Sequence, residues 1–202
     1  IPYMRCIPNI VVSAPMNESE LRNLMYTSQL DSTQLPFVIR YPRGQGVMPE
    51  WQTEMKEVVI GKGRKIKDGK DIAILSFGHP GNFAAAAIRD LKNDGINPGH
   101  YDMRFAKPLD EELLHEALKN YDKIITVEDG CIEGGFGSAI LEFMSQHGYK
   151  NDIKILGIPD VIVEHGTPKE LHHECGFDAV AIKEAVLEMM RGKVTVSQST
   201  FG

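Results

Sequence analysis

From residue 71 onward, strand-like and helix-like segments alternate four times, and this alternation restricts the possible folds more than any other feature of the sequence. The first strand-like segment, DIAILSFG at 71–78, is almost continuously apolar, as expected for a strand that is covered on both faces. Strands that alternate with helices form an open, mostly parallel α/β sheet flanked by helices. We expect strands at 71–78, 100–105, 123–129 and 152–158, and helices at 81–95, from 110, at 134–148, from 167 and at 178–191.

The first 46 residues predict a smaller strand–helix–strand unit. Two short runs, at 7–13 and 36–41, are rich in β-branched and aromatic residues and are typical of strands. Between them, Asn17 with Glu20 three residues later matches a capping box, and an apolar helix face follows as far as Gln29. We therefore divide the chain into a first unit at 1–46, a linker with a hairpin-like turn at 47–70, an α/β domain at 71–192 and a polar tail at 193–202.

The composition excludes several classes of protein. With 42% hydrophobic and 25% charged residues, the 202-residue chain can bury a core and is typical of a globular protein. The net charge of −6 and the mixed signs give no basic surface for nucleic acid. No apolar run reaches the roughly 18–20 residues that span a bilayer, so we expect no membrane partner. Residues 1–10 lack the charged leader and apolar segment of a secretory signal, and we expect a cytoplasmic protein.

The three cysteines are Cys6, Cys131 and Cys175. They are odd in number and far apart in the sequence, which argues against a disulfide framework. We expect free, buried thiols in a reducing compartment.

Six segments occur in an order and at spacings that match a known family. They are MRCIP at 4–8, SAPMNESELRNLMYT at 13–27, RYPRG at 40–44, YDMRFAKPLD at 101–110, TVEDGCIEGGFGSA at 126–139, and GIPD with HGTPKEL between 157 and 171. Together they resemble the 1-deoxy-D-xylulose-5-phosphate synthases, from the middle of the pyrimidine-binding domain to the end of the chain. The combination of RYPRG with DMRFxKPLD and VEDGxxxGGFGS is more specific than any single glycine motif.

The resemblance implies a homodimeric enzyme that depends on thiamine diphosphate and Mg²⁺. Such an enzyme decarboxylates pyruvate and joins the two-carbon unit to D-glyceraldehyde 3-phosphate, and the product feeds non-mevalonate isoprenoid and thiamine biosynthesis. The cofactor performs the carbanion chemistry, while the protein supplies position and charge. The resemblance also implies that residues 1–46 are the tail of the pyrimidine-binding domain and that residues 71–192 form a transketolase C-terminal-type domain.

The same resemblance identifies parts that this chain lacks. The family's Gly-Asp-Gly diphosphate segment and its cofactor-activating Glu do not occur in the sequence. The chain opens with Ile1 rather than Met, and we expect these parts upstream of it. We therefore assign no catalytic, cofactor-binding or metal-binding residue and expect no binding of thiamine diphosphate by this chain alone. Two alternatives stay open: another enzyme of the superfamily, such as a transketolase or a 2-oxo acid dehydrogenase β subunit, or a non-catalytic module of the same fold.

Arg43 is the one residue that we assign to a binding site. It follows a predicted strand and Pro42, and α/β folds bind ligands at the carboxyl ends of their strands. A guanidinium can fork onto a phosphate, which an ammonium cannot do. In the family, the second Arg of RYPRG binds the phosphate of glyceraldehyde 3-phosphate, and Arg43 matches that position. The alternative is a structural arginine at a domain junction, and we expect Arg40 to have such an ion-paired role and to point elsewhere.

Two further segments admit both a functional and a structural interpretation. Glu128 and Asp129 could be paired acid/base groups, but neighbouring side chains of a strand diverge, which favours hydrogen bonds across an interface. The glycine-rich turn at 134–138 could hold a phosphate at a helix start. It lacks the Lys-Ser/Thr ending of a Walker loop, so tight packing of strand against helix is the favoured interpretation.

Histidines and cysteines give weaker signals. The metal-like group in the sequence consists of His165, His172, His173 and Cys175. It has no second Cys or His pair at zinc spacing, so metal binding is the less favoured interpretation. We interpret Cys131 as a packed thiol and His79 as a surface or capping group.

Overall fold

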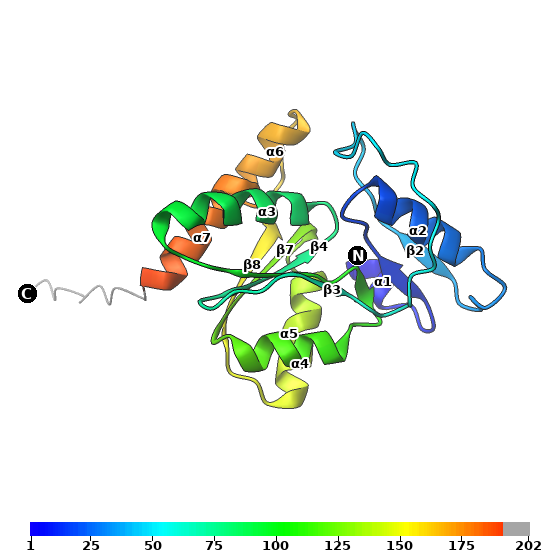
Figure 1. Ribbon diagram of the computed structural model, residues 1–202, viewed down its shortest axis with the longest axis horizontal. Helices are drawn as coiled ribbons and strands as arrows, with labels where there is room; N and C mark the ends of the chain where they lie inside the picture. The colour runs from blue at the N-terminus through cyan, green and yellow to red at the C-terminus, as the bar shows by residue number, and fades with distance from the viewer. Residues whose placement is uncertain (192–202) are drawn as a thin grey trace, which may run out of the picture.

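The structure is a computed structural model that describes residues 1–191, and the tail predicted at 193–202 lies outside the described residues. The chain forms two packed parts, each built on its own sheet (Figure 1). None of the helices within residues 1–191 is both long and apolar enough to cross a bilayer. The elements are α1 (Pro2–Arg5), β1 (Val11–Ser13), α2 (Glu18–Ser28), β2 (Phe37–Ile39), β3 (Arg64–Lys67), β4 (Ala73–Phe77), α3 (Pro80–Leu91), the 3₁₀ turn η1 (Lys92–Asp94), β5 (Gly99–Asp102), β6 (Phe105–Lys107), α4 (Glu111–Asn120), β7 (Lys123–Cys131), α5 (Phe136–His147), β8 (Asp152–Ile158), α6 (Pro168–Glu174) and α7 (Ala179–Arg191).

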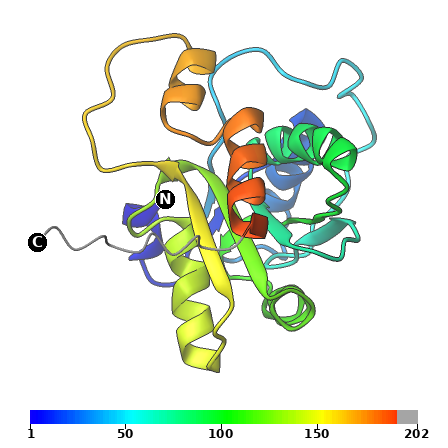
Figure 2. The same ribbon diagram turned by 90° about the vertical axis from the view of Figure 1, so that its left-hand side faces the viewer.

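The larger part is a five-stranded sheet in the order β3-β5-β4-β7-β8. Every neighbouring pair is parallel except β3 with β5, which is antiparallel. Helices α3 and α7 cover one face of this sheet, and α4 and α5 cover the other (Figures 1 and 2). The predicted open, mostly parallel sheet flanked by helices is confirmed.

The central strand β4 shows why an apolar run folds in this way. Ile72 and Ile74 belong to the core that contains α3 and α7. Ala73, Leu75 and Phe77 belong to the core that contains α4 and α5. Successive side chains of a strand point to opposite faces, so a strand between two helical layers is apolar at most positions. Ser76 is the buried polar residue of β4, and its hydroxyl is hydrogen-bonded to His100.

The smaller part is a three-stranded sheet in the order β2-β1-β6. The parallel pair β1–β2 and helix α2 form the predicted strand–helix–strand unit. Strand β6 comes from the second half of the chain and pairs antiparallel with β1. The single strand expected at 100–105 is therefore wrong: β5 ends at Asp102, and Arg104 adopts a left-handed φ of 54°, which turns the chain out of the large sheet. Phe105 then packs beside Val11 in the small sheet's own core.

The segment that joins the two parts is not a hairpin, contrary to the prediction. From Gly44 to Gly63 the chain has no helix or strand, and the backbone N–H of Val58 donates to Thr27 Oγ1 on α2 at 2.8 Å. Strand β3 then pairs with β5 and not with β4, which directly follows it. The sequence alone does not predict that the short run RKIK forms an edge strand, because the run is mostly polar.

A network of charged side chains, in which the carboxylates of Glu20 and Asp102 are buried, connects the two parts. Glu20 on α2 accepts hydrogen bonds from Arg104 at 2.7 and 3.1 Å and from Arg64 at 2.9 Å. Arg64 also donates to Asp102 at 3.0 Å. The predicted N-cap is confirmed, because Asn17 Oδ1 accepts from the Glu20 backbone at 3.0 Å. The other half of the expected capping box is wrong, because the Glu20 carboxylate binds the two arginines.

Candidate ligand site at the junction of the two parts

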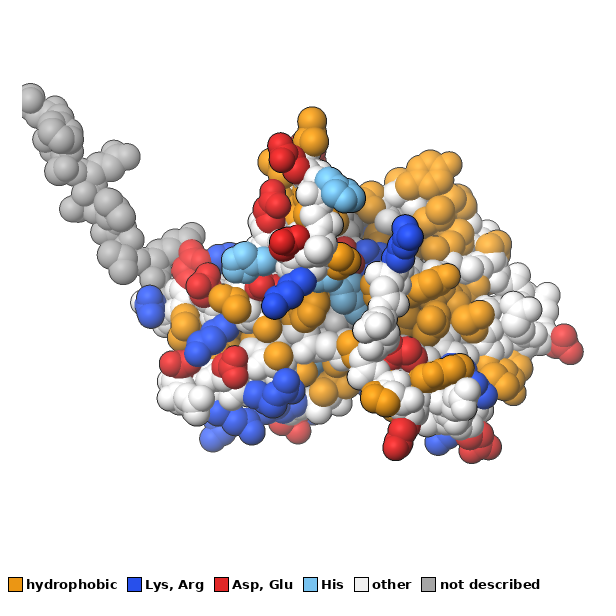
Figure 3. Space-filling model, turned by 90° about the horizontal axis from the view of Figure 1, so that it is seen from above, with side chains coloured by type: hydrophobic (Ala, Val, Ile, Leu, Met, Phe, Trp, Pro, Cys, Tyr) orange, Lys and Arg blue, Asp and Glu red, His pale blue; other side chains and the backbone are white. Residues whose placement is uncertain are grey.

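A hollow lies where the carboxyl ends of β4 and β7 face the segment that follows β2. Two adjoining cavities of about 470 and 490 Å³ occupy it, and both are lined by Tyr41, Pro42, Arg43, Pro168 and His172. Figure 3 shows histidine side chains in this hollow, between the larger part of the molecule and the smaller one. Ligands of α/β folds bind at the carboxyl ends of strands and in concave surfaces, so this hollow is the candidate site.

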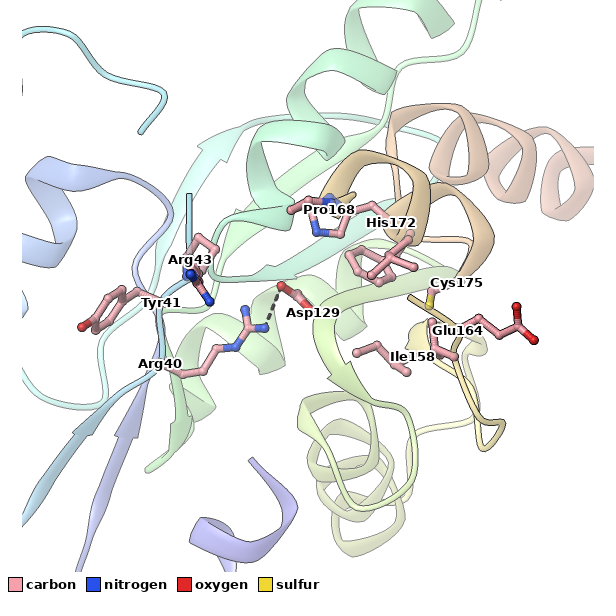
Figure 4. A pocket seen from close by; sticks show the side chains of 13 residues that line it. Arg40, Tyr41, Arg43, Asp129, Ile158, Glu164, Pro168, His172 and Cys175 are labelled. Carbon is pink, nitrogen blue, oxygen red and sulfur yellow. Dashed lines mark ion pairs between the residues drawn. The ribbon is translucent and has the colours of Figure 1, made fainter. Parts of the chain in front are cut away.

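Arg43 lines both cavities from the segment just after β2. Its side chain is exposed and lies next to that of Arg40 (Figure 4). Within residues 1–191 it makes no hydrogen bond or ion pair. A guanidinium that faces a cavity with all its donors unpaired can bind an anion bidentately. The assignment of Arg43 to a phosphate stays a prediction.

Arg40 links the two parts of the molecule through an ion pair. Its guanidinium lies 2.7 Å from Asp129 Oδ2 at the end of β7 (Figure 4). The predicted ion-paired role of Arg40 is confirmed. The expectation that it points elsewhere is wrong, because it lines the same cavity as Arg43. The chain bends at Arg43 and Gly44, and Arg40 and Arg43 line the same cavity although they are three positions apart.

Glu128 and Asp129 diverge as predicted, and each forms its own contacts. Glu128 is buried at 1% exposure and accepts a hydrogen bond from the backbone of Gly137 at 2.9 Å, at the start of α5. Burial raises the pKa of Glu128, while hydrogen bonds from the Phe136 and Gly137 backbones lower it. A Cβ on Gly135 would lie only 2.2 Å from the Cys131 carbonyl oxygen. The glycine-rich turn therefore permits tight strand-to-helix packing, as favoured, and its helix start is filled by the protein's own carboxylate.

The histidine group differs from the one that the sequence indicated. Of the predicted set, only His172 joins a metal-like group, together with His79 and Asp129, and their potential ligand atoms lie within 4.8 Å of one another. His173 instead contacts Asp178 at 2.9 Å. His79 occupies the N-cap position of α3, but its side chain forms no capping hydrogen bond and is largely buried, so its interpretation as a surface or capping side chain is wrong. The missed signal is its position directly after β4, because the carboxyl ends of the neighbouring parallel strands β4 and β7 meet at one edge of the sheet.

Burial disfavours the protonated form of both histidines of this group. Burial lowers the pKa of His79 to about 4, although the carboxylate of Asp129 acts in the opposite direction. Burial also lowers the pKa of His172. The positive charges at the hollow are therefore those of the arginines.

The cysteines are free, and two of the three are not buried. Cys6 and Cys131 are exposed, and Cys175 is partly buried against the cavity wall. The predicted packing of Cys131 is wrong because β7 extends to this residue at the rim of the sheet, beyond the helices that cover its centre.

The described residues do not fit thiamine diphosphate with its Mg²⁺. The one group of three potential metal ligands among residues 1–191 supplies two imidazoles and a carboxylate already paired with Arg40. Mg²⁺ prefers oxygen ligands in octahedral geometry. The helix start at the glycine-rich turn already holds Glu128. We therefore assign no chemical step of that cofactor to the residues of this chain.

The fold and the junction define a class of protein. Residues 61–182 match the transketolase C-terminal domain, and the chain belongs to this family. The chain is 60% identical over 186 residues to the 1-deoxy-D-xylulose-5-phosphate synthase of Cytophaga hutchinsonii, and 52% identical over 187 residues to that of Bacteroides thetaiotaomicron. Each match covers 92% of this chain and 29% of the relative, so the chain spans less than a third of the length of these relatives.

A solved structure supports the arrangement of both parts. The structure described as a split gene transketolase, inactive beta4 tetramer, superposes with a TM-score of 0.83 at 29% sequence identity. The match covers 94% of this chain and 61% of the transketolase chain. The similarity thus includes the smaller sheet as well as the C-terminal domain.

Proposed function

We propose that this chain is the carboxy-terminal portion of a thiamine-diphosphate-dependent transferase. The complete enzyme would condense pyruvate, with loss of CO₂, and D-glyceraldehyde 3-phosphate to 1-deoxy-D-xylulose 5-phosphate in isoprenoid biosynthesis. The relatives named above support this reaction, because they carry the name of that synthase. In this proposal, thiamine diphosphate and Mg²⁺ are bound by residues of the complete enzyme that lie outside this chain. It also includes a cytoplasmic homodimer, with residues 1–46 as the tail of the pyrimidine-binding domain, 47–70 as a linker and 71–192 as the C-terminal domain.

The single observation that carries the role of this chain is the guanidinium of Arg43, which faces the junction cavity and has no partner among residues 1–191. A sugar phosphate brings close to two negative charges, which an Arg side chain can hold with two parallel hydrogen bonds. The charge of Arg40 is already balanced by Asp129, and its guanidinium lines the cavity beside that of Arg43. We infer that Arg43 binds the phosphate of the aldehyde substrate, and that this chain forms one wall of the substrate pocket.

Replacing Arg43 by alanine in the complete enzyme is expected to raise the KM for glyceraldehyde 3-phosphate by about 10- to 100-fold, since hydrogen bonds to charged groups contribute about 1.5–3 kcal/mol. The KM for pyruvate should change little, because pyruvate carries no phosphate. Arg43→Lys should fall between the parent and Arg43→Ala, since an ammonium keeps the charge and loses the fork. Steady-state kinetics with each substrate varied in turn provides the measurement.

Arg89 offers a matched control for this experiment. It is an exposed arginine in the last turn of α3. Arg89→Ala should leave both KM values at the parental level. Equal changes in the two KM values of Arg43→Ala, or no change, would remove the phosphate assignment while leaving the proposed reaction intact. An absence of product from pyruvate and glyceraldehyde 3-phosphate with the parent enzyme would contradict the reaction itself.

A further inference from the structure

Three side chains from separate elements converge beside the junction cavity. His79 directly precedes α3, Asp129 lies near the end of β7, and His172 lies on α6. Their potential ligand atoms are all within 4.8 Å of one another, and His79 Nε2 is 3.5 Å from Asp129 Oδ2. The rings of His79 and His172 are 5.3 Å apart between centroids. Residues far apart in the sequence thus supply two imidazoles and one carboxylate to one small volume.

His79 is buried without satisfying its polar atoms. Its side chain is 13% exposed, and neither ring nitrogen has a hydrogen-bond partner among the described residues. Burial of an unpaired polar group costs free energy, which a ligand at that nitrogen would recover.

We propose that His79, Asp129 and His172 form a binding site for a divalent transition-metal ion of the zinc type. Imidazole nitrogen with one carboxylate oxygen suits Zn²⁺ and neighbouring transition metals better than Mg²⁺ or Ca²⁺. Metal–ligand bonds of about 2.0–2.1 Å in tetrahedral geometry place ligand atoms about 3.3 Å apart. The present separations of up to 4.8 Å between the ligand atoms would therefore shorten when a metal binds. The fourth position then faces the cavity, as in zinc sites with three protein ligands.

The charges around this group set the strength of the site. Arg40 contacts Asp129 at 2.7 Å, so its positive charge opposes a bound cation while it orients the carboxylate. Arg43 lines the same cavity and has the same sign. The two guanidiniums lower the affinity for the metal alone and favour an anion as the fourth ligand. Removal of the charge of Arg40 is therefore expected to strengthen metal binding at this group, whereas binding at a histidine remote from Arg40 should not change.

Isothermal titration calorimetry tests the site. The full 202-residue chain is titrated with Zn²⁺ in a buffer that contains Mg²⁺ in excess. We expect one saturable site per chain. His79→Ala and His172→Ala should each weaken binding by at least about tenfold, since even partners that only orient a ligand are worth about 10- to 100-fold. Asp129→Asn should also weaken it, and Arg40→Gln should tighten it several-fold.

His173 provides the matched control, because it neighbours His172 in sequence while its own side chain is 68% exposed and bound to Asp178. His173→Ala should keep the parental affinity. Far-UV circular dichroism shows whether each variant folds. If His79→Ala does not fold, His172→Ala still tests the site, because His172 is partly exposed and its replacement should disturb the core less. The proposal is overturned by the absence of saturable Zn²⁺ binding, by unchanged affinity in folded His172→Ala, or by an equal loss in His173→Ala.

Discussion

Replacement of Glu20 by alanine is expected to lower the free energy of unfolding by about 3–5 kcal/mol, the range observed when one partner of a buried ion pair is removed. The carboxylate is 5% exposed and binds Arg104 through both of its oxygens. It also accepts from Arg64. Without it, Arg104 and Arg64 keep their charges at the junction with only Asp102 to balance them. Urea unfolding at constant pH, followed by circular dichroism, measures the change.

Two comparisons separate the charge of Glu20 from its volume. Glu20→Gln keeps the shape and should be less destabilising than Glu20→Ala. Glu111→Ala, at an exposed residue in the first turn of α4, should change stability by less than about 1 kcal/mol. Glu20→Ala and Arg104→Ala should be clearly non-additive in a double-mutant cycle, because the two residues are in direct contact. Additive effects, or a Glu20→Ala variant as stable as the parent, would contradict the role of the network.

Acidification from about pH 7 to about pH 4 is expected to remove about 3 kcal/mol of stability through His100 alone, at 1.36 kcal/mol for each pKa unit. His100 is 1% exposed, its Nε2 lies 2.9 Å from Ser76 Oγ, and burial beside Arg64 and Lys67 lowers its pKa from 6.5 to about 4. As the pH falls below 6.5, His100 takes up a proton in the unfolded chain, whereas in the folded chain it does so only near pH 4. The unfolded state then binds more protons, so stability falls as the pH falls.

Four other groups with shifted pKa values contribute to the pH dependence of stability. His79 acts in the same direction, because burial also lowers its pKa to about 4. Asp102 acts in the opposite direction: burial raises its pKa from 3.8 to about 6, so the folded chain gains a proton first and is stabilised as the pH falls between these values. Burial also lowers the pKa of His172, which acts in the same direction as His100. It raises the pKa of Glu128, which acts in the same direction as Asp102. Because these contributions oppose one another, a variant is needed to isolate that of His100.

A variant without the titrating ring isolates the contribution of His100. His100→Gln should be less stable than the parent at about pH 7, and this difference should shrink by about 3 kcal/mol by about pH 4. His165→Gln, at an exposed histidine, should follow the parental pH dependence. Unfolding free energies from urea titrations across the pH range provide the data. A constant difference between parent and His100→Gln would contradict the assignment.

The pattern of the sequence predicted the larger sheet because local signals and tertiary packing agree there. Continuous apolar runs, capped helices and short turns at 71–191 admit few arrangements other than a parallel sheet between helical layers. The strand–helix–strand unit at 1–46 followed from the same kind of signal. The resemblance of RYPRG and the later motifs to a family added Arg43, which no periodicity would have distinguished from any other exposed arginine.

The tertiary structure alone decided how the ends of these elements combine. The left-handed turn at Arg104 sends β6 to the small sheet, a choice that the run HYDMRF does not reveal. The partner of Glu20 proved to be an arginine 84 residues away and not its own helix start. His79, Asp129 and His172 were interpreted separately in the sequence. His79 and Asp129 meet because the parallel strands β4 and β7 end at the same edge, and helix α6 brings His172 to them. Local patterns fix the elements, whereas long-range contacts depend on which sheet edge and which charge each element meets after it has formed.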